Sequence, residues 1–270
     1  MWVLIHRETV YQIRKVNMYL LTTNPILIAA AVIPAVFLMV KVYKADRLDK
    51  EPKSFLVSLL FFGILSTAIA VALEELGSFL LGILFRKEGI LYNLIMYYGV
   101  VAFSEEGSKY FLLKKKTWNN PNFNCQFDAV VYSTFVSLGF ALWENIGYVA
   151  KFGLSTALAR ALTAVPGHAC FGVFMGVMYG LAKKFSIIGN TTNAEKFKKL
   201  SLTVPVFMHG TYDFLTTVGK GLSLIFVAFV IAMFVIAYRL VKNVSENDSY
   251  IDTEISPNHP NADYIEFTEE

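Results

Sequence analysis

The stretch that decides the fold class is residues 55–83, which read FLVSLLFFGILSTAIAVALEELGSFLLGI. Its only ionisable residues are Glu74 and Glu75. A hydrocarbon core about 30 Å thick is crossed by roughly 20 mostly apolar residues in helical form. This stretch is long enough to cross it, so we predict a membrane-spanning helix here.

Six further windows have the same character, and none shows the period-two alternation of a membrane β-barrel. They cover residues 24–42, 92–113, 129–150, 156–182, 200–218 and 221–241. The chain is 55% hydrophobic and 17% charged, with a mean hydropathy of +0.50, which excludes an ordinary soluble globule and a disordered chain. We therefore predict an all-α polytopic membrane helix bundle of about seven transmembrane helices.

The cysteine content and the net charge exclude other classes of protein. Cys125 and Cys170 are far apart and form no CxxC pair, so the sequence offers neither a disulfide framework nor a thiolate zinc site. A net charge of +3 is too small and too scattered to indicate nucleic acid binding.

The regions outside the spans indicate three parts and an orientation. We expect residues 1–23 to form an interfacial segment, residues 24–242 the transmembrane catalytic domain, and residues 243–270, with eight of the 21 acidic residues, a disordered tail. The segments outside the spans form two alternating sets, one for each side of the membrane. One set carries 15 Lys and Arg residues and the other carries 8. Because cytoplasmic loops are the basic ones, we expect the N-terminus outside and the acidic tail in the cytoplasm.

Several ionisable residues lie inside these apolar windows, where each costs on the order of 2.5–3.5 kcal/mol to insert and is a functional candidate. They are Glu105, Glu106, Lys109, Glu144, His168, His209 and Asp213. Glu105 and Lys109 are four residues apart, as are His209 and Asp213, so each pair shares one helix face. Lys109 is thus placed to neutralise one of two adjacent carboxylates.

Two chemistries fit these residues, and the spacing alone does not choose between them. In the first, the metal ligands are His168, His209, Glu144 and Asp213, which hold zinc while Glu105 deprotonates a bound water. In the second, no metal is present, and Glu105 activates water directly while His209 supports the oxyanion.

Other functions use similar residues. A proton-coupled transporter or channel would use the same charges as a relay, and a non-catalytic scaffold would use them for packing. We expect Arg160 to extend to the outer interface rather than join the site. The chain contains no HExxH, GxGD, GxSG or Walker motif, which disfavours four other membrane protease and ATPase chemistries.

Five segments occur in order along the chain and together resemble one known family. Residues 105–109 (EEGSK) fit EExxK, residues 140–144 (FALWE) fit FxxxE, and residues 209–213 (HGTYD) fit HxxxD. Residues 46–52 (DRLDKEP) are similar to D-R-x-x-x-E-P, and residues 160–168 resemble the fifth-span segment. These are signatures of the PrsW-type intramembrane proteases.

The resemblance implies a bacterial cell-membrane protease related to type II CAAX prenyl proteases. The implied activity is site-one cleavage of a single-span anti-sigma factor, which begins release of an extracytoplasmic-function sigma factor. These prenyl-protease relatives typically have histidine at the position of Glu144 and asparagine at that of Asp213; the differences fit the PrsW branch, and the resemblance does not decide whether zinc is used. The site residues carried over by position are Glu105, Glu106, Lys109, Glu144, His209 and Asp213, with His168 as a further candidate.

Overall fold

The computed structural model describes residues 25–85, 89–218 and 223–251. Its elements are α3 (Pro25–Ala45), α4 (Lys53–Leu84), α5 (Ile90–Leu94), the π-helix η1 (Ile95–Ala102), α6 (Phe103–Thr117), α7 (Asp128–Phe152), α8 (Leu154–Leu162), α9 (Ala164–Ile187), α10 (Thr191–Val218) and α11 (Ser223–Glu246). No β-strand occurs in these three ranges, apart from one isolated bridge between Cys125 and Tyr250. The all-α prediction is confirmed.

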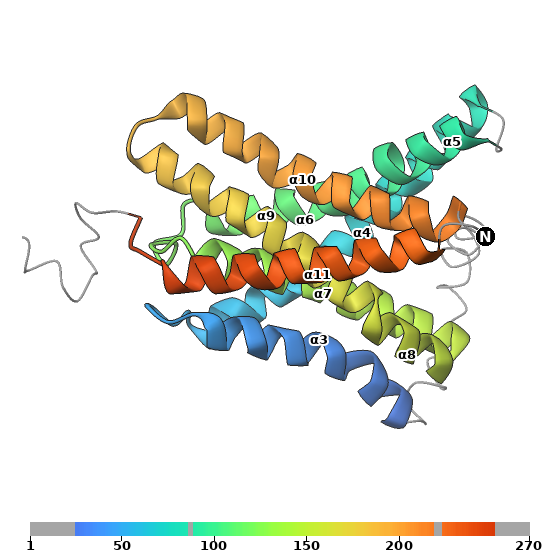
Figure 1. Cartoon of the computed structure of the whole chain (residues 1–270), viewed down its shortest axis with the longest axis horizontal. Helices are drawn as coiled ribbons and strands as arrows, with labels where there is room; N and C mark the ends of the chain where they lie inside the picture. Colours follow the sequence, from blue (N-terminus) through green and yellow to red (C-terminus); the bar gives the residue numbers. More distant parts are fainter. Residues whose placement is uncertain (1–24, 86–88, 219–222, 252–270) are drawn as a thin grey trace, which may run out of the picture.

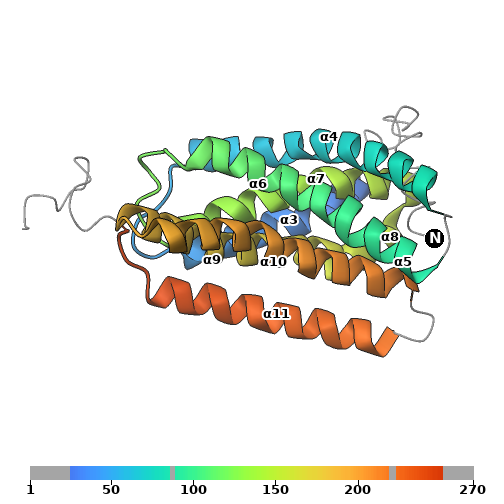
Figure 2. The ribbon, with the colours of Figure 1, turned by 90° about the horizontal axis from the view of Figure 1, so that it is seen from above.

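Five helical segments in the described ranges are long and apolar enough to cross a membrane: α3, α4, α7, α8 with α9, and α11. The other two predicted spans, 92–113 and 200–218, are also helical, but α6 and α10 carry the ionisable residues of the site and several lysines. Both lie lengthwise in the bundle beside the apolar helices (Figure 2). A count of seven spans therefore remains a prediction.

Helices α7 and α9 form the centre of the bundle. In the most apolar window of α7, 78% of residues are buried, against 22% in α3, 33% in α4 and 17% in α11. Helix α9 packs against α7, α10 and α11, while α3 and α4 cover other sides of α7 (Figures 1 and 2). The outer helices thus face the surroundings with apolar side chains, as a lipid environment requires.

Glycines allow the central helices to approach closely. A Cβ atom on Gly63 of α4 would lie 2.1 Å from the backbone oxygen of Val136, and one on Gly139 of α7 would lie 2.3 Å from that of Leu60. Gly176 of α9 is equally close to α7, because a Cβ atom on it would lie 2.3 Å from a serine hydroxyl. Small residues at such crossings let membrane helices pack backbone against backbone.

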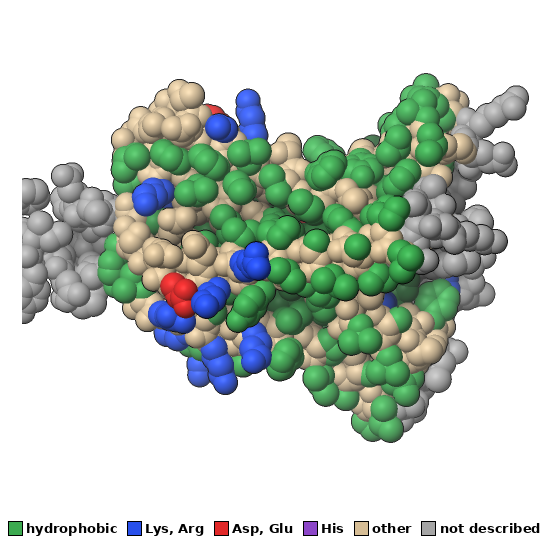
Figure 3. Space-filling model, viewed as in Figure 1, with side chains coloured by type: hydrophobic (Ala, Val, Ile, Leu, Met, Phe, Trp, Pro, Cys, Tyr) green, Lys and Arg blue, Asp and Glu red, His purple; other side chains and the backbone are tan. Residues whose placement is uncertain are grey.

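Basic side chains gather at one end of the molecule, whereas the rest of the visible face is mostly hydrophobic (Figure 3). At this end α6 finishes with three lysines and the α3–α4 loop begins. The loop into α7 and the end of α11 lie there too. This is the end predicted to face the cytoplasm.

The chain beyond the last predicted span is partly described. Helix α11 continues to Glu246, and the following residues pack on the loop before α7, where the Ile251 amide donates to the Asn124 carbonyl at 2.7 Å. Residues 1–24 and 252–270 lie outside the described residues. The predicted interfacial segment, and the predicted tail apart from residues 243–251, fall in these ranges.

Candidate functional site

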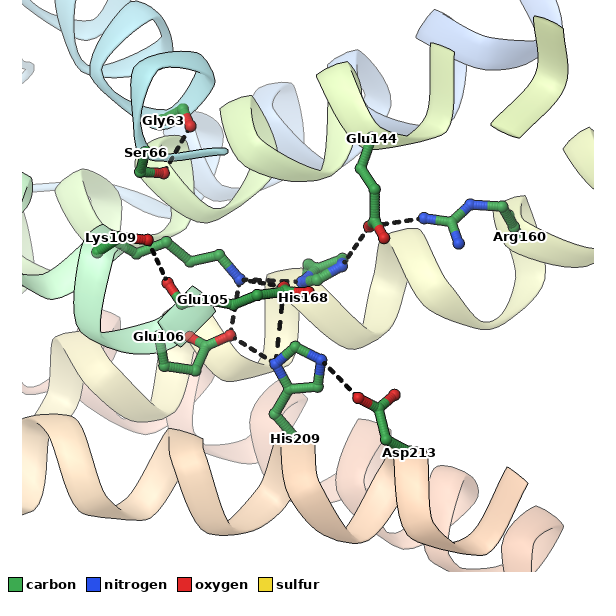
Figure 4. Close-up of polar contacts among 11 residues, drawn as sticks. Gly63, Ser66, Glu105, Glu106, Lys109, Glu144, Arg160, His168, His209 and Asp213 are labelled. Carbon is green, nitrogen blue, oxygen red and sulfur yellow. Dashed lines mark hydrogen bonds and ion pairs between the residues drawn. The ribbon is translucent and has the colours of Figure 1, made fainter. Parts of the chain in front are cut away.

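Four helices bring the predicted polar residues to one place in the interior (Figure 4). Helix α6 carries the EExxK residues, α7 carries Glu144, α9 carries His168, and α10 carries His209 and Asp213. As the spacing predicts, Lys109 lies 3.4 Å from Glu105 and His209 lies 3.5 Å from Asp213, each pair on one helix face.

The ammonium group of Lys109 is the centre of the inner part of the site. Its Nζ donates to Glu106 Oε1 at 2.7 Å and Glu105 Oε2 at 3.4 Å, and contacts His168 Nδ1 at 3.2 Å. The side chain is fully buried beneath the Phe140 ring, whose centroid is 3.9 Å away. All three N–H bonds of this ammonium therefore have acceptors, and His168 Nδ1 must accept because an ammonium can only donate.

Each histidine links this inner part to an outer carboxylate. His209 places Nδ1 2.9 Å from Glu106 Oε1 and Nε2 3.5 Å from Asp213 Oδ2. His168 directs Nε2 to Glu144 Oε2 at 3.0 Å, and this nitrogen carries the proton because Nδ1 accepts. The two rings are 5.4 Å apart and nearly perpendicular. A proton can therefore pass through either ring between the inner and outer groups.

Arg160 belongs to the site, so the expectation that it extends to the outer interface is wrong. It is only 8% exposed, and its guanidinium donates to Glu144 Oε2 at 2.8 Å and to Asn145 Oδ1 at 3.0 Å. Asn145 in turn donates to the backbone oxygen of Ala31 at 2.8 Å, which ties α7 to α3. A buried guanidinium is favourable here because it finds a carboxylate and an amide oxygen.

A small cavity of about 20 Å³ lies on the outer side of the two imidazoles. It is lined by Glu144, Arg160, Ala164, Gly167, His168, Phe171, His209, Tyr212 and Asp213. This volume holds about one water molecule and no polypeptide. Glu105 and Glu106 do not line this cavity. In this conformation the two imidazoles link the glutamates to the cavity.

The described cluster is short of positive charge. Its carboxylates are those of Glu105, Glu106, Glu144 and Asp213, and its permanent cations are Lys109 and Arg160. His209 lies between two carboxylates and is balanced best as an imidazolium, which leaves one negative charge uncompensated. A proton or a metal ion would remove that charge, so the arrangement favours a group that accepts protons.

The structure brings together a different set of ligand atoms from the predicted one. The atoms that lie within 4.8 Å of one another come from Glu105, Glu106, His168 and His209. Glu144 and Asp213 instead contact the far nitrogens of the two histidines. Carboxylates in that position commonly orient histidine ligands, so these two fit a supporting role around a metal.

The donor set fits a metal ion. Two imidazole nitrogens and two carboxylate oxygens suit zinc, and Glu106 Oε2 is buried without a hydrogen-bond partner among the described residues. Lys109 contacts three of these four side chains, so its ammonium and a metal would compete for the same atoms.

Two features of the site have no clear signal in the sequence. Glu74 of α4 is 4% exposed and lies close enough to Glu105 for their charges to interact. In the sequence, the only sign of this was the position of Glu74 inside an apolar span. The π-helix η1 ends directly before α6 and so sets the rotation at which the glutamate pair enters the bundle. Such helices are frequent at functional sites.

Comparisons with known proteins agree with the motifs. A sequence profile described as "PrsW family intramembrane metalloprotease" matches residues 51–239. "Protease PrsW" of Geobacillus kaustophilus is 33% identical over 217 residues, covering 80% of this chain and 91% of the relative. "Protease PrsW" of Bacillus subtilis is 34% identical over 197 residues, covering 71% and 83%. "Protease PrsW" of Clostridioides difficile is 26% identical over 209 residues, covering 74% and 79%. No solved structure matches the chain.

Proposed function

The chain belongs to the PrsW family of intramembrane metalloproteases and is a peptidase of the bacterial membrane, and from this premise we propose its specific reaction. The reaction is hydrolysis of one peptide bond of a single-span anti-sigma factor, the first cut in activating an extracytoplasmic-function sigma factor. The observation that carries the peptidase reaction is the buried cluster of carboxylates and imidazoles beside a water-sized cavity. The anti-sigma substrate is supported by the ordered motifs shared with the family.

In the proposed reaction Glu105 is the general base. Glu106 Oε1 already accepts from Lys109 at 2.7 Å and from His209 at 2.9 Å, and these close positive groups stabilise its ionised form. The nearest corresponding contacts of Glu105 Oε2 are longer, at 3.4 and 3.9 Å. Glu105 is therefore the carboxylate with more capacity to take a proton from an attacking water.

The remaining side chains position this base and stabilise charge. Lys109 balances the glutamate pair, and the positive charge of His209, which is held by Asp213 and lines the cavity, stabilises the oxyanion that forms when water attacks the amide carbon. His168, held by Glu144, also lines the cavity, so it can pass a proton to the leaving amine from Nε2 while Nδ1 takes one from Lys109, to which Glu105 returns the proton of the water. The substrate must separate helices to enter, because the cavity holds only one water.

We also propose a second chemistry at the same atoms, in which zinc would be held by Glu106, His168 and His209 while Glu105 stays the base, and in which the two imidazoles act as ligands rather than as acid and oxyanion stabiliser. When bound, zinc supplies a polarised amide carbonyl and an acidified water. Elemental analysis of the purified protein, together with cleavage assays before and after chelation, tests this assignment. Metal-free protein with full activity would remove zinc from the proposal and leave the glutamate chemistry.

We also propose that the N-terminus lies outside the cell and the C-terminus in the cytoplasm. The support is the concentration of Lys and Arg at the end of the bundle where the α3–α4 and α6–α7 loops lie (Figure 3). Labelling of single cysteines introduced into these loops, in intact cells and in lysed cells, tests it.

The reaction is tested with purified protein and a single-span anti-sigma substrate in proteoliposomes. We expect Glu105→Gln to lower kcat by about 10²–10⁴-fold, the range for loss of a general base. The matched control is Glu75→Gln, because Glu75 is an exposed acid on α4 and should be dispensable. Full turnover by folded Glu105→Gln protein would refute the role of Glu105. Cleavage of other membrane proteins, but of no anti-sigma factor, would refute the substrate alone.

A further inference from the structure

Helix α11 lies along one side of the bundle and covers two residues of the cavity wall (Figure 2). Its Phe226 packs edge-on against Tyr212 of α10, with 5.2 Å between the ring centroids. Its Met233 is 2% exposed and lies over Gly167 of α9, where a Cβ atom would be 4.0 Å from the methionine methyl. Both Tyr212 and Gly167 line the cavity, so α11 lies directly behind them.

Polar contacts fix only the C-terminal end of α11. The Ser245 hydroxyl donates to the backbone oxygen of Ala45, and Glu246 pairs with Arg47 at 3.8 Å. The chain just after α11 also bonds the loop before α7. Between residues 223 and 242, α11 makes no side-chain hydrogen bond or ion pair to another described helix. The two ends of α11 are therefore held in different ways.

The rest of α11 is held by a narrow apolar stripe. Its buried apolar residues are Val230, Met233 and Ala237, which are three and four positions apart and so share one face. Apolar contacts of this kind give membrane helices little reason to stay together, because lipid chains are equally apolar. Another apolar helix, or lipid, can therefore replace this part of α11 at small cost.

The other helices around the cavity are tied to one another by buried polar contacts. Helix α8 is joined to α7 by Arg160 and Glu144 at 2.8 Å, and α6 is joined to α10 by Glu106 and His209 at 2.9 Å. Helix α7 is joined to α9 where Ser133 donates to the Gly172 carbonyl at 2.7 Å. Separating any of these pairs breaks a buried polar contact, whereas moving the N-terminal half of α11 breaks none among the described residues.

Gly167 leaves room on the face that α11 covers. A Cβ atom there would meet no atom nearer than 3.8 Å, so packing within this chain does not require a glycine. Glycine is less favourable than alanine inside a helix, by about 1 kcal/mol. Its use at a cavity wall allows another backbone to approach closely. Gly167 therefore marks where a second chain can come up against α9.

We propose that the N-terminal half of α11 moves away from α9 and α10, and that the transmembrane segment of the substrate docks on the surface uncovered there. The inference rests on the proposed function, because the opening serves to admit a membrane-spanning substrate. The occupant is a single apolar helix, since the surface is covered by such a helix when closed. Gly167 and Tyr212 belong to both this surface and the cavity, so the docked chain reaches the site there.

Cross-linking tests whether α11 must move. Tyr212→Cys and Phe226→Cys, introduced together, put two thiols where the rings now touch, and a short bis-methanethiosulfonate reagent joins them through disulfides. In proteoliposomes with a single-span anti-sigma substrate, we expect cleavage to stop when the thiols are joined and to resume when dithiothreitol releases them. Full cleavage by the cross-linked protein would refute the movement of α11 and leave the proposed function intact. Absence of cleavage by the unsubstituted protein would refute the proposed function instead.

The matched control joins α11 at its other end. Ala45→Cys and Ser245→Cys bridge α3 and α11 at the contact that stays closed, so the same reagent should leave cleavage unchanged. The unsubstituted protein, whose Cys125 and Cys170 are both buried, receives the reagent as well and should keep its activity. Equal inhibition by the two cross-links would overturn the proposal.

Substrate docking is measured without cleavage in protein that carries Glu105→Gln. Benzoylphenylalanine replaces Phe226 of α11 or, as the control, Phe61 of α4, whose ring is 61% exposed on the outside of the bundle. On illumination we expect the substrate span to attach to position 226 and not to position 61. Equal attachment at the two positions, or none at 226, would contradict the docking surface even if the cysteine variants were inactive.

A substitution at Gly167 tests the close approach. Gly167→Ala adds a methyl group that meets no atom within 3.8 Å, so the melting temperature should hold. We expect kcat/KM to fall by about 10–100-fold, mainly through KM, because the substrate backbone is displaced. The control Gly147→Ala adds a methyl group on α7 that meets nothing within 4 Å, and should leave KM unchanged. An unchanged KM in folded Gly167→Ala protein would refute docking at this glycine.

Discussion

Replacing Lys109 by methionine should destabilise the protein strongly, because it leaves buried carboxylates without their cation. The ammonium lies 2.7 Å from Glu106 and 3.4 Å from Glu105, and all three side chains are at most 2% exposed. At an effective dielectric constant of about 20, unit charges 2.7 Å apart attract by about 6 kcal/mol, before desolvation is subtracted. Breaking such a buried pair from one side typically costs about 3–5 kcal/mol, which is the loss we expect.

A double-mutant cycle separates this pairing from simple loss of packing. Lys109→Met and Glu106→Gln, made singly and together, should give a coupling energy of about 2–3 kcal/mol, because the double variant removes both charges of the closest pair. The free energy of unfolding is measured by titration with SDS in mixed micelles, with helix content followed by circular dichroism.

The control uses a lysine on the same helix. Lys114→Met changes an exposed residue of α6 and should alter the free energy of unfolding by less than about 0.5 kcal/mol. A coupling energy near zero in the Lys109 cycle, or equal losses from Lys109→Met and Lys114→Met, would refute the inference that this ammonium neutralises the glutamate pair.

Three further results are expected. Gly139→Ala should destabilise the protein by about 1–3 kcal/mol or more, because its Cβ would lie 2.3 Å from a backbone oxygen of α4. Gly147→Ala on the same helix meets no atom within 4 Å and should be neutral or slightly stabilising, and equal melting curves for the two variants would contradict this. Asn145→Ala should cost about 1–3 kcal/mol, because it leaves Arg160 Nε and a backbone oxygen of α3 without partners; unchanged stability in the same SDS titration would argue against this link. Removal of metal with 1,10-phenanthroline should abolish cleavage, and addition of zinc should restore it; activity that survives complete removal would exclude a catalytic metal.

Contacts within one helix could be predicted because helical spacing alone sets them. The 3.6-residue period places Glu105 beside Lys109 and His209 beside Asp213 whatever the rest of the chain does. The apolar windows likewise predict the helices, since a segment that is buried in lipid must satisfy its backbone hydrogen bonds internally.

Contacts between helices could not be predicted, because they depend on how each helix is rotated and how closely it packs. The EExxK segment follows a π-helix, which shifts the rotation of the glutamate pair about the helix axis. Close helix crossings at glycines set how deep Glu144 of α7 lies in the bundle. These factors place Glu144 at the far nitrogen of His168 rather than among the central ligand atoms. Arg160 turns inward for the same reason, because its partners lie on a neighbouring helix.

By itself, the sequence determined the helical class, the membrane environment, the family and, apart from Arg160 and Glu74, the residues that enter the buried site. Only the tertiary structure decided which of them touch, and only it brought Asp46 within electrostatic range of Asp248, some two hundred residues along the chain. The physical reason is that hydrophobicity and helical period act over a few turns. The meeting of distant carboxylates depends on how whole helices pack, and no local pattern records it.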